Sequence, residues 1–333
     1  MKRGKKLLAL VAVLIILTGA TFITKTLAPK DNTATNTENN IKFTILTIES
    51  DMVESLSWTC EDESLNFIYS EDTWSYADDS SFPLNSSYIS SMLSSISNIE
   101  ASKMIEDVKD FSQYGLDVPV CTISVGYGSG CKLLIGNETA VDGLRYFSIG
   151  DGNVYLVDSS ILDAFSYGLY DLIQKESIPT MSDIVSVSVT SETQSLLLEY
   201  VSTTDADGNT ENAWCYTNGN NALTLDTALT EIFVSNITGL SFGECANYNA
   251  DDETLAAYKF SSPTITVTVV YTEDSQRKLF SLEFVQYTDS ICFVRIAGSR
   301  MIYSIDTTLI DTLLNTGYAD LQLVEETVEG VTE

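Results

Sequence analysis

Alternating hydrophobic and polar positions recur in distant parts of the chain and predict β-strands. The clearest examples are CTISVGY at 121–127 and ITVTVVY at 265–271, where every second residue is hydrophobic. This period is typical of a strand with one buried face. Residues 65–77 predict a two-stranded hairpin around the turn SED, and residues 196–216 predict the same hairpin with a longer loop.

Between these strands the hydrophobic spacing changes to that of an amphipathic helix. One such helix follows Asn85 and another follows Asp226, and both residues are typical N-caps. Asp158 and Asp306 predict two more helix starts, before SSILDAF and TTLIDTL. The hydrophobic positions of the first pair of helices are Ile89, Met92, Leu93 and Ile96 in one, and Phe233, Val234 and Ile237 in the other.

These elements occur twice in the same order. SDMVESLSW corresponds to SDIVSVSV, TWSY to AWCY, LNSSYISSMLSSISNI to LDTALTEIFVSNITGL, and GDGNVYLVDSSILDAF to GSRMIYSIDTTLIDTL. The offset between the copies grows from 132 to 140, 141 and 148 residues, as insertions in the second copy would produce. The chain is therefore predicted to be a tandem repeat.

We expect an α+β fold, in which each copy is a β-rich module of hairpin, helix, antiparallel strands and closing helix. The first repeat domain is expected at 42–178 and the second at 179–322. Residues 25–41 are polar and predict a linker, and residues 323–333 predict an acidic tail.

The N-terminus has the pattern of a membrane segment. The basic flank MKRGKK at 1–6 precedes an uncharged, hydrophobic stretch, and residues 7–24 are predicted to form a transmembrane signal anchor. Because basic flanks stay in the cytoplasm, the rest of the chain is expected outside the cell membrane. A signal peptide cleaved after Ala20 is the alternative.

The remainder of the chain is strongly acidic. Six of the 17 basic residues lie within the first 30 positions, so the rest carries 11 basic residues against 47 acidic ones, a net charge of −36. Phosphate backbones would be repelled, which excludes nucleic acid as a partner.

The six cysteines are isolated, without a CxxC pair, which argues against structural zinc. Cys121 and Cys131 flank a Gly-rich hairpin and are the candidate disulfide pair. The other four are expected to be small buried residues.

The sequence contains no histidine, which excludes Ser–His and Cys–His catalysis. No catalytic residue or cofactor is predicted. The loop DADGNTE has oxygen-bearing side chains at alternate positions, so Asp205, Asp207, Asn209 and Glu211 are calcium candidates, although Asp-Gly also favours a simple hairpin turn.

Several aromatic and turn residues are predicted to have structural roles. YGLDVP at 114–119 corresponds to YKFSSP at 258–263, at an offset of 144, and is expected to form the corner before a strand, with the proline as its first residue. The residues of this corner are Tyr114, Gly115, Leu116 and Pro119 in one copy and Tyr258, Phe260 and Pro263 in the other, where Lys259 replaces the glycine. Trp74, Tyr76, Trp214 and Tyr216 are expected to anchor the hairpins to the core, with sugar stacking as the alternative for the tryptophans.

The membrane segment, TWSY, ISNIEA, YGLDVP, LLIGNET and YFSIGDGNVYLVD together resemble the bacterial domain of unknown function DUF4340. The resemblance spans 42–180 and, more loosely, 181–320. It implies an extracytoplasmic accessory role beside ABC transporter subunits and implies no catalytic residue. We therefore expect a membrane-anchored accessory or scaffold protein that is not an enzyme, with ABC transporter permease or auxiliary subunits as partners. An extracellular module that binds glycan or calcium is the alternative.

Overall fold

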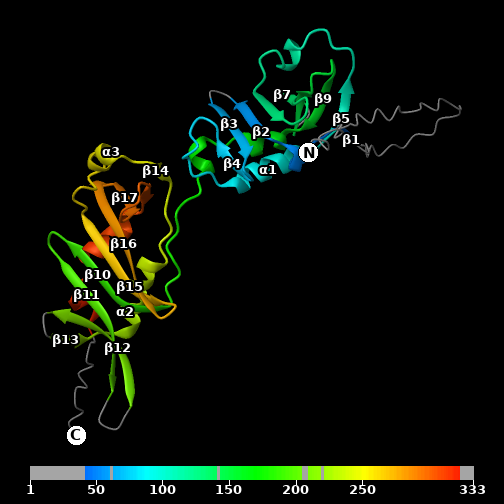
Figure 1. Cartoon of the computed structure of the whole chain (residues 1–333). Coiled ribbons are helices and arrows are strands. Elements are labelled where there is room, and N and C mark those ends of the chain that lie inside the picture. Colours follow the sequence, from blue (N-terminus) through cyan, green and yellow to red (C-terminus); the bar gives the residue numbers. More distant parts are fainter. Residues whose placement is uncertain (1–41, 61–62, 141–142, 205–208, 219–220, 323–333) are drawn as a thin grey trace, which may run out of the picture. The chain divides into compact units, whose positions relative to one another are not determined.

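The computed structural model describes residues 42–60, 63–140, 143–204, 209–218 and 221–322 (Figure 1). No helix within these ranges is long and hydrophobic enough to span a membrane. The predicted anchor, the linker that follows it and the acidic tail lie outside the described residues.

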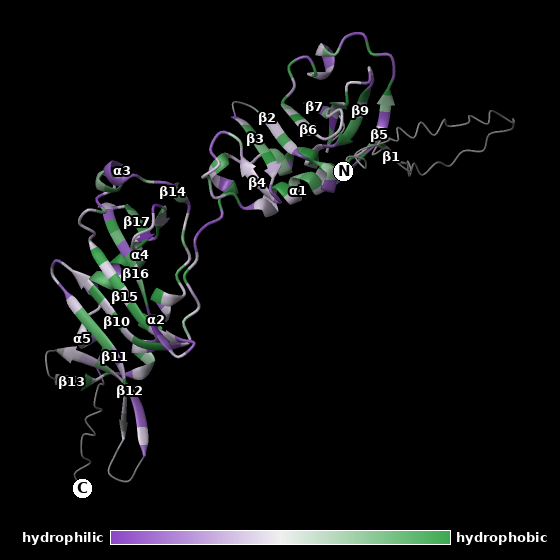
Figure 2. Ribbon diagram, viewed as in Figure 1, coloured by the Kyte–Doolittle hydropathy of each residue, from purple (hydrophilic) through white to green (hydrophobic). Residues whose placement is uncertain are grey.

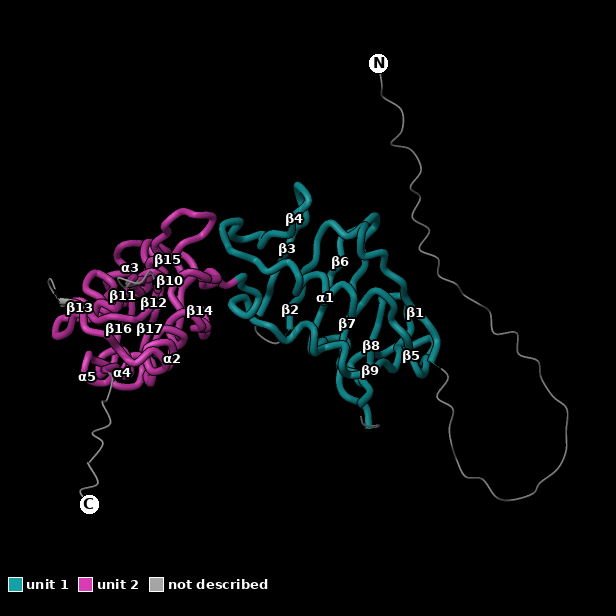
Figure 3. The backbone as a smooth tube through the Cα atoms, turned by 90° about the horizontal axis from the view of Figure 1, so that it is seen from below, with its two compact units in different colours: residues 1–174 teal, residues 175–333 magenta. Residues whose placement is uncertain are grey.

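The chain divides into two compact units between Gln174 and Lys175 (Figure 3). The sequence predicted a division between residues 178 and 179. Each unit is mostly β with a few short helices, and each contains one nine-stranded antiparallel sheet. Hydrophobic residues concentrate in the central strands of both sheets (Figure 2).

The first unit has the sheet order β1-β5-β9-β8-β7-β6-β2-β3-β4. Its strands are β1 (Phe43–Thr47), β2 (Ser55–Cys60), β3 (Glu63–Ser70), β4 (Thr73–Tyr76), β5 (Asn98–Ile105), β6 (Cys121–Gly126), β7 (Cys131–Glu138), β8 (Leu144–Ser148) and β9 (Val154–Asp158). Its helices are α1 (Ser86–Ile96) and the 3₁₀ helices η1 (Ser50–Met52), η2 (Ser112–Tyr114), η3 (Ser159–Phe165) and η4 (Leu169–Leu172).

The second unit has the order β13-β12-β11-β10-β15-β16-β17-β18-β14. Its strands are β10 (Asp183–Ser191), β11 (Ser195–Thr204), β12 (Thr210–Asn218), β13 (Asn221–Thr224), β14 (Cys245–Asn247), β15 (Ile265–Glu273), β16 (Gln276–Thr288), β17 (Ile291–Ile296) and β18 (Ile302–Ile305). Its helices are α2 (Thr227–Thr238), α3 (Asp252–Ala257), α4 (Thr307–Asn315) and α5 (Tyr318–Leu321).

The two sheets share eight strands in the same spatial order, which confirms the duplication. Read from one edge, β5-β9-β8-β7-β6-β2-β3-β4 corresponds to β14-β18-β17-β16-β15-β10-β11-β12. The registers agree as well, because Leu56 lies opposite Val125 in the first sheet and Val187 opposite Val269 in the second. Leu56 and Val187 are therefore equivalent, at an offset of 131 in these strands.

The ninth strand differs between the units, and a proline lies at the equivalent position in the unit that lacks it. The first unit adds β1 at one edge, and the second adds β13 at the other. Pro83 occupies the position in the first unit that Thr224 of β13 occupies in the second, and Pro179 corresponds to Thr47 of β1. Proline lacks the N–H that a strand donates, and neither of these segments is a strand.

The predicted helices α1 and α2 are confirmed, together with their caps. The Asn85 side chain accepts the Ser87 N–H at 3.1 Å, and the Asp226 side chain accepts the Leu229 N–H at 2.9 Å. All seven hydrophobic positions predicted for these helices are buried. Helix α1 packs against η3, β4 and β5, and α2 packs against β12.

The two predicted closing helices differ from each other. Asp158 and Asp306 cap their segments as predicted, with N–H donors at Ser160 (3.1 Å) and Thr308 (2.7 Å). The segment after Asp306 is the α-helix α4, whereas the one after Asp158 is the 3₁₀ helix η3. The shared hydrophobic spacing predicts a helix in both places but does not distinguish the tighter form.

A second repeated segment follows each closing helix. GLYDL at 168–172 and GYADL at 317–321 each form one short helical turn, in which the aspartate accepts the N–H of the glycine. The leucine carbonyl then accepts the N–H of the first helix's N-cap, Asn85 in one unit and Asp226 in the other, at 2.8 Å in both. Each module is thereby closed onto the start of its own helix.

Candidate functional site

The Tyr-containing corners have the same backbone conformation in both units. Gly115 has φ +69°, and Lys259 at the equivalent position has φ +67°. The corner residue Leu116 and its equivalent Phe260 are both only 4% exposed. The left-handed conformation is therefore retained although glycine is not.

The two corner tyrosines pack on equivalent strands. Tyr114 contacts Tyr146 of β8 edge to face at 4.8 Å between ring centroids, and Tyr258 contacts Phe293 of β17 at 4.9 Å. The prediction that proline is the first residue of each following strand is wrong. Pro119 and Pro263 each precede their strand by two residues, because β6 begins at Cys121 and β15 at Ile265.

The hairpin tryptophans make the same cross-strand contact in both units. Trp74 packs on Tyr69 at 5.4 Å, and Trp214 packs on Tyr200 at 5.2 Å. Trp214 is buried, whereas Trp74 is half-buried. The hairpin tyrosines also pack on aromatic rings: Tyr76 contacts Phe67 and Phe82, and Tyr216 stacks on Tyr318.

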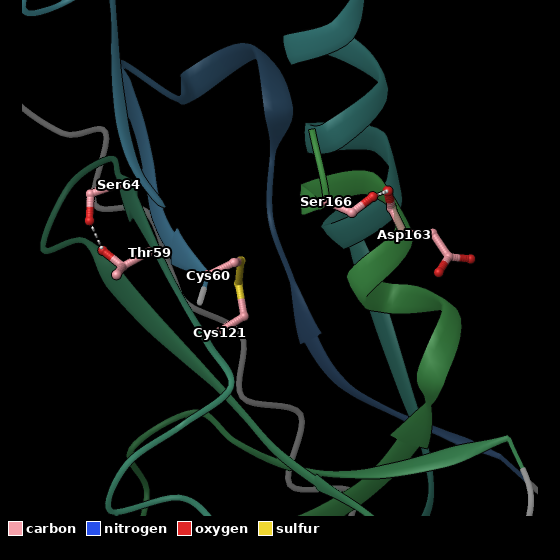
Figure 4. Close-up of a disulfide and its surroundings, with 6 residues drawn as sticks. All are labelled: Thr59, Cys60, Ser64, Cys121, Asp163 and Ser166. Carbon is pink, nitrogen blue, oxygen red and sulfur yellow. Dashed lines mark hydrogen bonds between the residues drawn. A yellow bond between two sulfur atoms is a disulfide. The ribbon is translucent and has the colours of Figure 1, made fainter. Parts of the chain in front are cut away.

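The predicted disulfide between Cys121 and Cys131 is wrong. The hairpin is confirmed, but its short turn places Cys131 opposite Val125, at the other end of β6 from Cys121. The disulfide joins Cys121 to Cys60 instead (Figure 4). These two residues lie directly opposite each other on β6 and β2, with Cα atoms 4.2 Å apart.

Three of the four free cysteines have a raised thiol pKa. Burial raises the pKa of the Cys131 and Cys292 thiols, and it raises the pKa of Cys245 to about 11. Because the thiolate is the nucleophilic form, these groups are poor nucleophiles at neutral pH. Burial likewise raises the pKa of the Tyr155 hydroxyl to about 12.

The calcium candidates are only partly described. Asp205 and Asp207 lie outside the described residues. Asn209 precedes β12, and Glu211 lies on β12 opposite Thr203. The described part of the chain contains no group of three or more His, Cys, Asp or Glu residues that could hold a metal ion.

The first unit contains a cavity of about 550 Å³ that the sequence did not predict. It lies between the end of the β2–β3 hairpin and the last turn of η3. Among the described residues, aromatic and aliphatic side chains form most of its lining, together with the Glu63 carboxylate and the disulfide-bonded Cys60. The cavity lining includes Trp58, Cys60, Glu63, Leu162, Phe165 and Tyr167.

The Glu63 carboxylate is held in place at this cavity. Its Oε1 atom accepts the Leu169 N–H at 3.1 Å. A Cβ atom at Gly168 would lie 3.2 Å from Oε2 of Glu63, so glycine gives this carboxylate the space it needs. The repeated Gly-x-x-Asp-Leu segment was the available sequence signal for this region, since Gly168 is its first residue.

A second, open cavity in the second unit is acidic. Three of its charged groups, Asp251, Asp252 and Arg300, have structural partners. Arg300 contacts the Ala250 carbonyl at 3.0 Å and Asp252 at 2.7 Å, and Asp251 caps α3 by accepting the Thr254 N–H. The hydrogen bonds from Thr254 lower the pKa of Asp251.

Comparison with known proteins finds one family. The model of DUF4340, a domain of unknown function, matches residues 74–232, from β4 of the first unit into α2 of the second. No curated protein and no solved structure matches the chain. The resemblance seen in the sequence is thus confirmed, and the chain contains a DUF4340 domain over residues 74–232.

Proposed function

We propose that the protein is a single-pass, membrane-anchored accessory or scaffold protein that faces away from the cytoplasm, is not an enzyme, and binds permease or auxiliary subunits of an ABC-type transport system. The hydrophobic segment at 7–24 and the DUF4340 resemblance support this role. The Cys60–Cys121 disulfide supports the location, because disulfides persist in oxidising compartments.

The outer face of α2 is the observation that carries the binding role. Leu229 is 45% exposed and Ile232 is 61% exposed, three residues apart on one side of the helix. Helix α1 is its counterpart in the first unit, and there Ser91 occupies the position of Ile232. The first unit adopts the same fold with serine at this position, so the exposed isoleucine of the second unit is not required for folding.

Charge indicates what kind of partner fits this face. Helix α2 contains Glu231 on its exposed side and no lysine or arginine. The chain beyond residue 30 has a net charge of −36, which disfavours pairing with a second copy. A protein segment with hydrophobic and basic side chains is the complementary partner.

Purification of the full-length protein from membranes tests the proposal. The wild-type protein is expected to recover transporter subunits, and the double variant Leu229→Ser, Ile232→Ser is expected to lose them. Leu279→Ser is the matched control, since Leu279 is an exposed leucine on β16. The proposal is wrong if the wild type recovers no transporter subunit, or if the double variant recovers them as well as the control does.

A binding module for a small ligand is the second candidate. The cavity of the first unit favours it, since its described lining is mostly hydrophobic and includes the Glu63 carboxylate, as is common for ligand sites. The tryptophans considered for sugar stacking, Trp74 and Trp214, do not line this cavity.

A further inference from the structure

The cavity of the first unit combines two features that suit an organic cation. Trp58, Phe165 and Leu162 give it a hydrophobic interior. Glu63 adds a carboxylate, and the ring of Tyr167 is 39% exposed beside it. Carboxylates and aromatic faces both attract ammonium and guanidinium groups.

The second unit shows which of these features the fold itself requires. In that unit Gln194 occupies the position of Glu63, and its side-chain nitrogen donates to the Thr316 carbonyl. In the first unit Glu63 accepts the Leu169 N–H. Both residues therefore fasten the segment that follows the closing helix to the sheet, and a neutral amide is sufficient for this purpose.

The aromatic lining is also specific to the first unit. The equivalent residues follow from the shared strand register and from the Asp158–Asp306 caps. In the second unit, Val189 takes the place of Trp58, Leu313 of Phe165, and Thr316, the residue before Gly317, of Tyr167. The carboxylate and the aromatic rings of the first unit are thus both replaced in the second unit, although the two units share the same framework.

We propose that this cavity is a binding site for an organic cation, an ammonium or guanidinium group on a hydrophobic stem. The stem occupies the space against Val120 and Leu162, beneath which the buried rings of Trp58 and Phe165 pack, and the cationic group lies between the Glu63 carboxylate and the Tyr167 ring. Such a ligand can be a free amine or a basic side chain of a peptide. The site does not depend on the partner proposed for α2.

Isothermal titration of the full-length protein in about 150 mM salt, which screens the general acidic field, tests the site. The probes are phenethylammonium, its neutral analogue phenethyl alcohol, and a blocked Phe-Lys dipeptide. Phenethylammonium is expected to bind and phenethyl alcohol to bind at least about tenfold more weakly, as loss of a charged hydrogen bond predicts. The dipeptide distinguishes the two sources: tighter binding than the free amine assigns the site to a peptide, and weaker binding assigns it to a small amine.

Glu63→Gln reproduces the second unit at this position and is expected to lower phenethylammonium affinity at least about tenfold. Glu100→Gln is the control, because Glu100 is an exposed acid on β5 and its replacement changes the net charge equally. Tyr167→Ala is a second variant and should also weaken binding. The proposal is overturned if the alcohol binds as well as the amine, if neither binds, or if Glu63→Gln folds normally and retains wild-type affinity.

Discussion

Gly115 and Lys259 show how one backbone conformation is kept with two different residues. Both lie in the left-handed region. A Cβ atom on Gly115 would lie 2.5 Å from the Asn137 side chain, which would have to move, so glycine is favoured there by space as well as by conformation. Lys259 is exposed, and its Nζ atom donates to the Tyr287 carbonyl at 2.9 Å.

We therefore predict that Gly115→Ala destabilises the protein by about 1–3 kcal/mol, from left-handed strain and the contact with Asn137. Chemical denaturation of the variant and the wild type measures the change. Lys259→Ala is the matched control, since this position already accommodates a side chain, and it should cost less than Gly115→Ala. Equal costs would contradict this account of the corner.

The Cys60–Cys121 disulfide should contribute strongly to stability, because it closes a loop with a sequence separation of 61 residues. Loop-closure entropy predicts that Cys60→Ser lowers the free energy of unfolding by about 4 kcal/mol. Thermal unfolding with and without reductant measures this, and reductant should affect the wild type but not the variant. Cys131→Ser is the control and should leave the response to reductant unchanged.

Asp306 provides a test at acidic pH. Hydrogen bonds from Thr308 lower the pKa of its carboxyl in the folded state. A lowered folded pKa stabilises the protein above the unfolded pKa, which is about 4 for aspartate, and this contribution is lost as pH falls through the folded value.

Asp306→Asn keeps the cap but removes the titration. The wild type should therefore be more stable than this variant at pH 6, and the difference should shrink as pH falls below about 4. Thermal unfolding across pH measures it. A difference that grows with acidification would contradict the assignment of Asp306 as an ionised cap.

At the scale of elements, the sequence predicted most of the framework. Hydrophobic period and cap residues were sufficient for α1 and α2, because their buried faces and their caps depend on neighbours in the chain. The corner before each strand was predicted from YGLDVP and YKFSSP for the same reason.

Features that depend on strand register were not predictable. The disulfide required knowledge that β2 lies beside β6 and that Cys60 lies opposite Cys121. The cavity required the position of η3 over the β2–β3 hairpin, and its carboxylate, Glu63, lies 106 residues from its hydrogen-bond partner Leu169. Spacing along one segment does not contain such long-range information.

The whole molecule is best understood as one module used twice, with different surfaces. The eight shared strands and the Gly-x-x-Asp-Leu closure are framework. The two copies differ at positions that the framework does not fix. The first unit has an aromatic, acidic cavity, and the second has a hydrophobic outer face on α2. We propose separate binding roles for these two surfaces.

The acidic body makes charge a property of the whole molecule. Beyond residue 30 the chain carries 47 acidic and 11 basic residues, so partners with basic surfaces are favoured at any exposed site. Specific binding of a partner must therefore be distinguished from general attraction by the acidic surface. Positions 232 and 91 are equivalent in the two units, so comparing them separates these two effects.

Photo-crosslinking in intact membranes tests the central claim most directly. A photoreactive amino acid is placed at position 232 on α2 or at the equivalent position 91 on α1, in otherwise identical full-length protein. We predict crosslinks from position 232 to a permease or auxiliary subunit of an ABC-type transporter, and none from position 91. Crosslinking from neither position, or equally from both, would contradict the claim that the second unit is a docking surface for a transporter subunit.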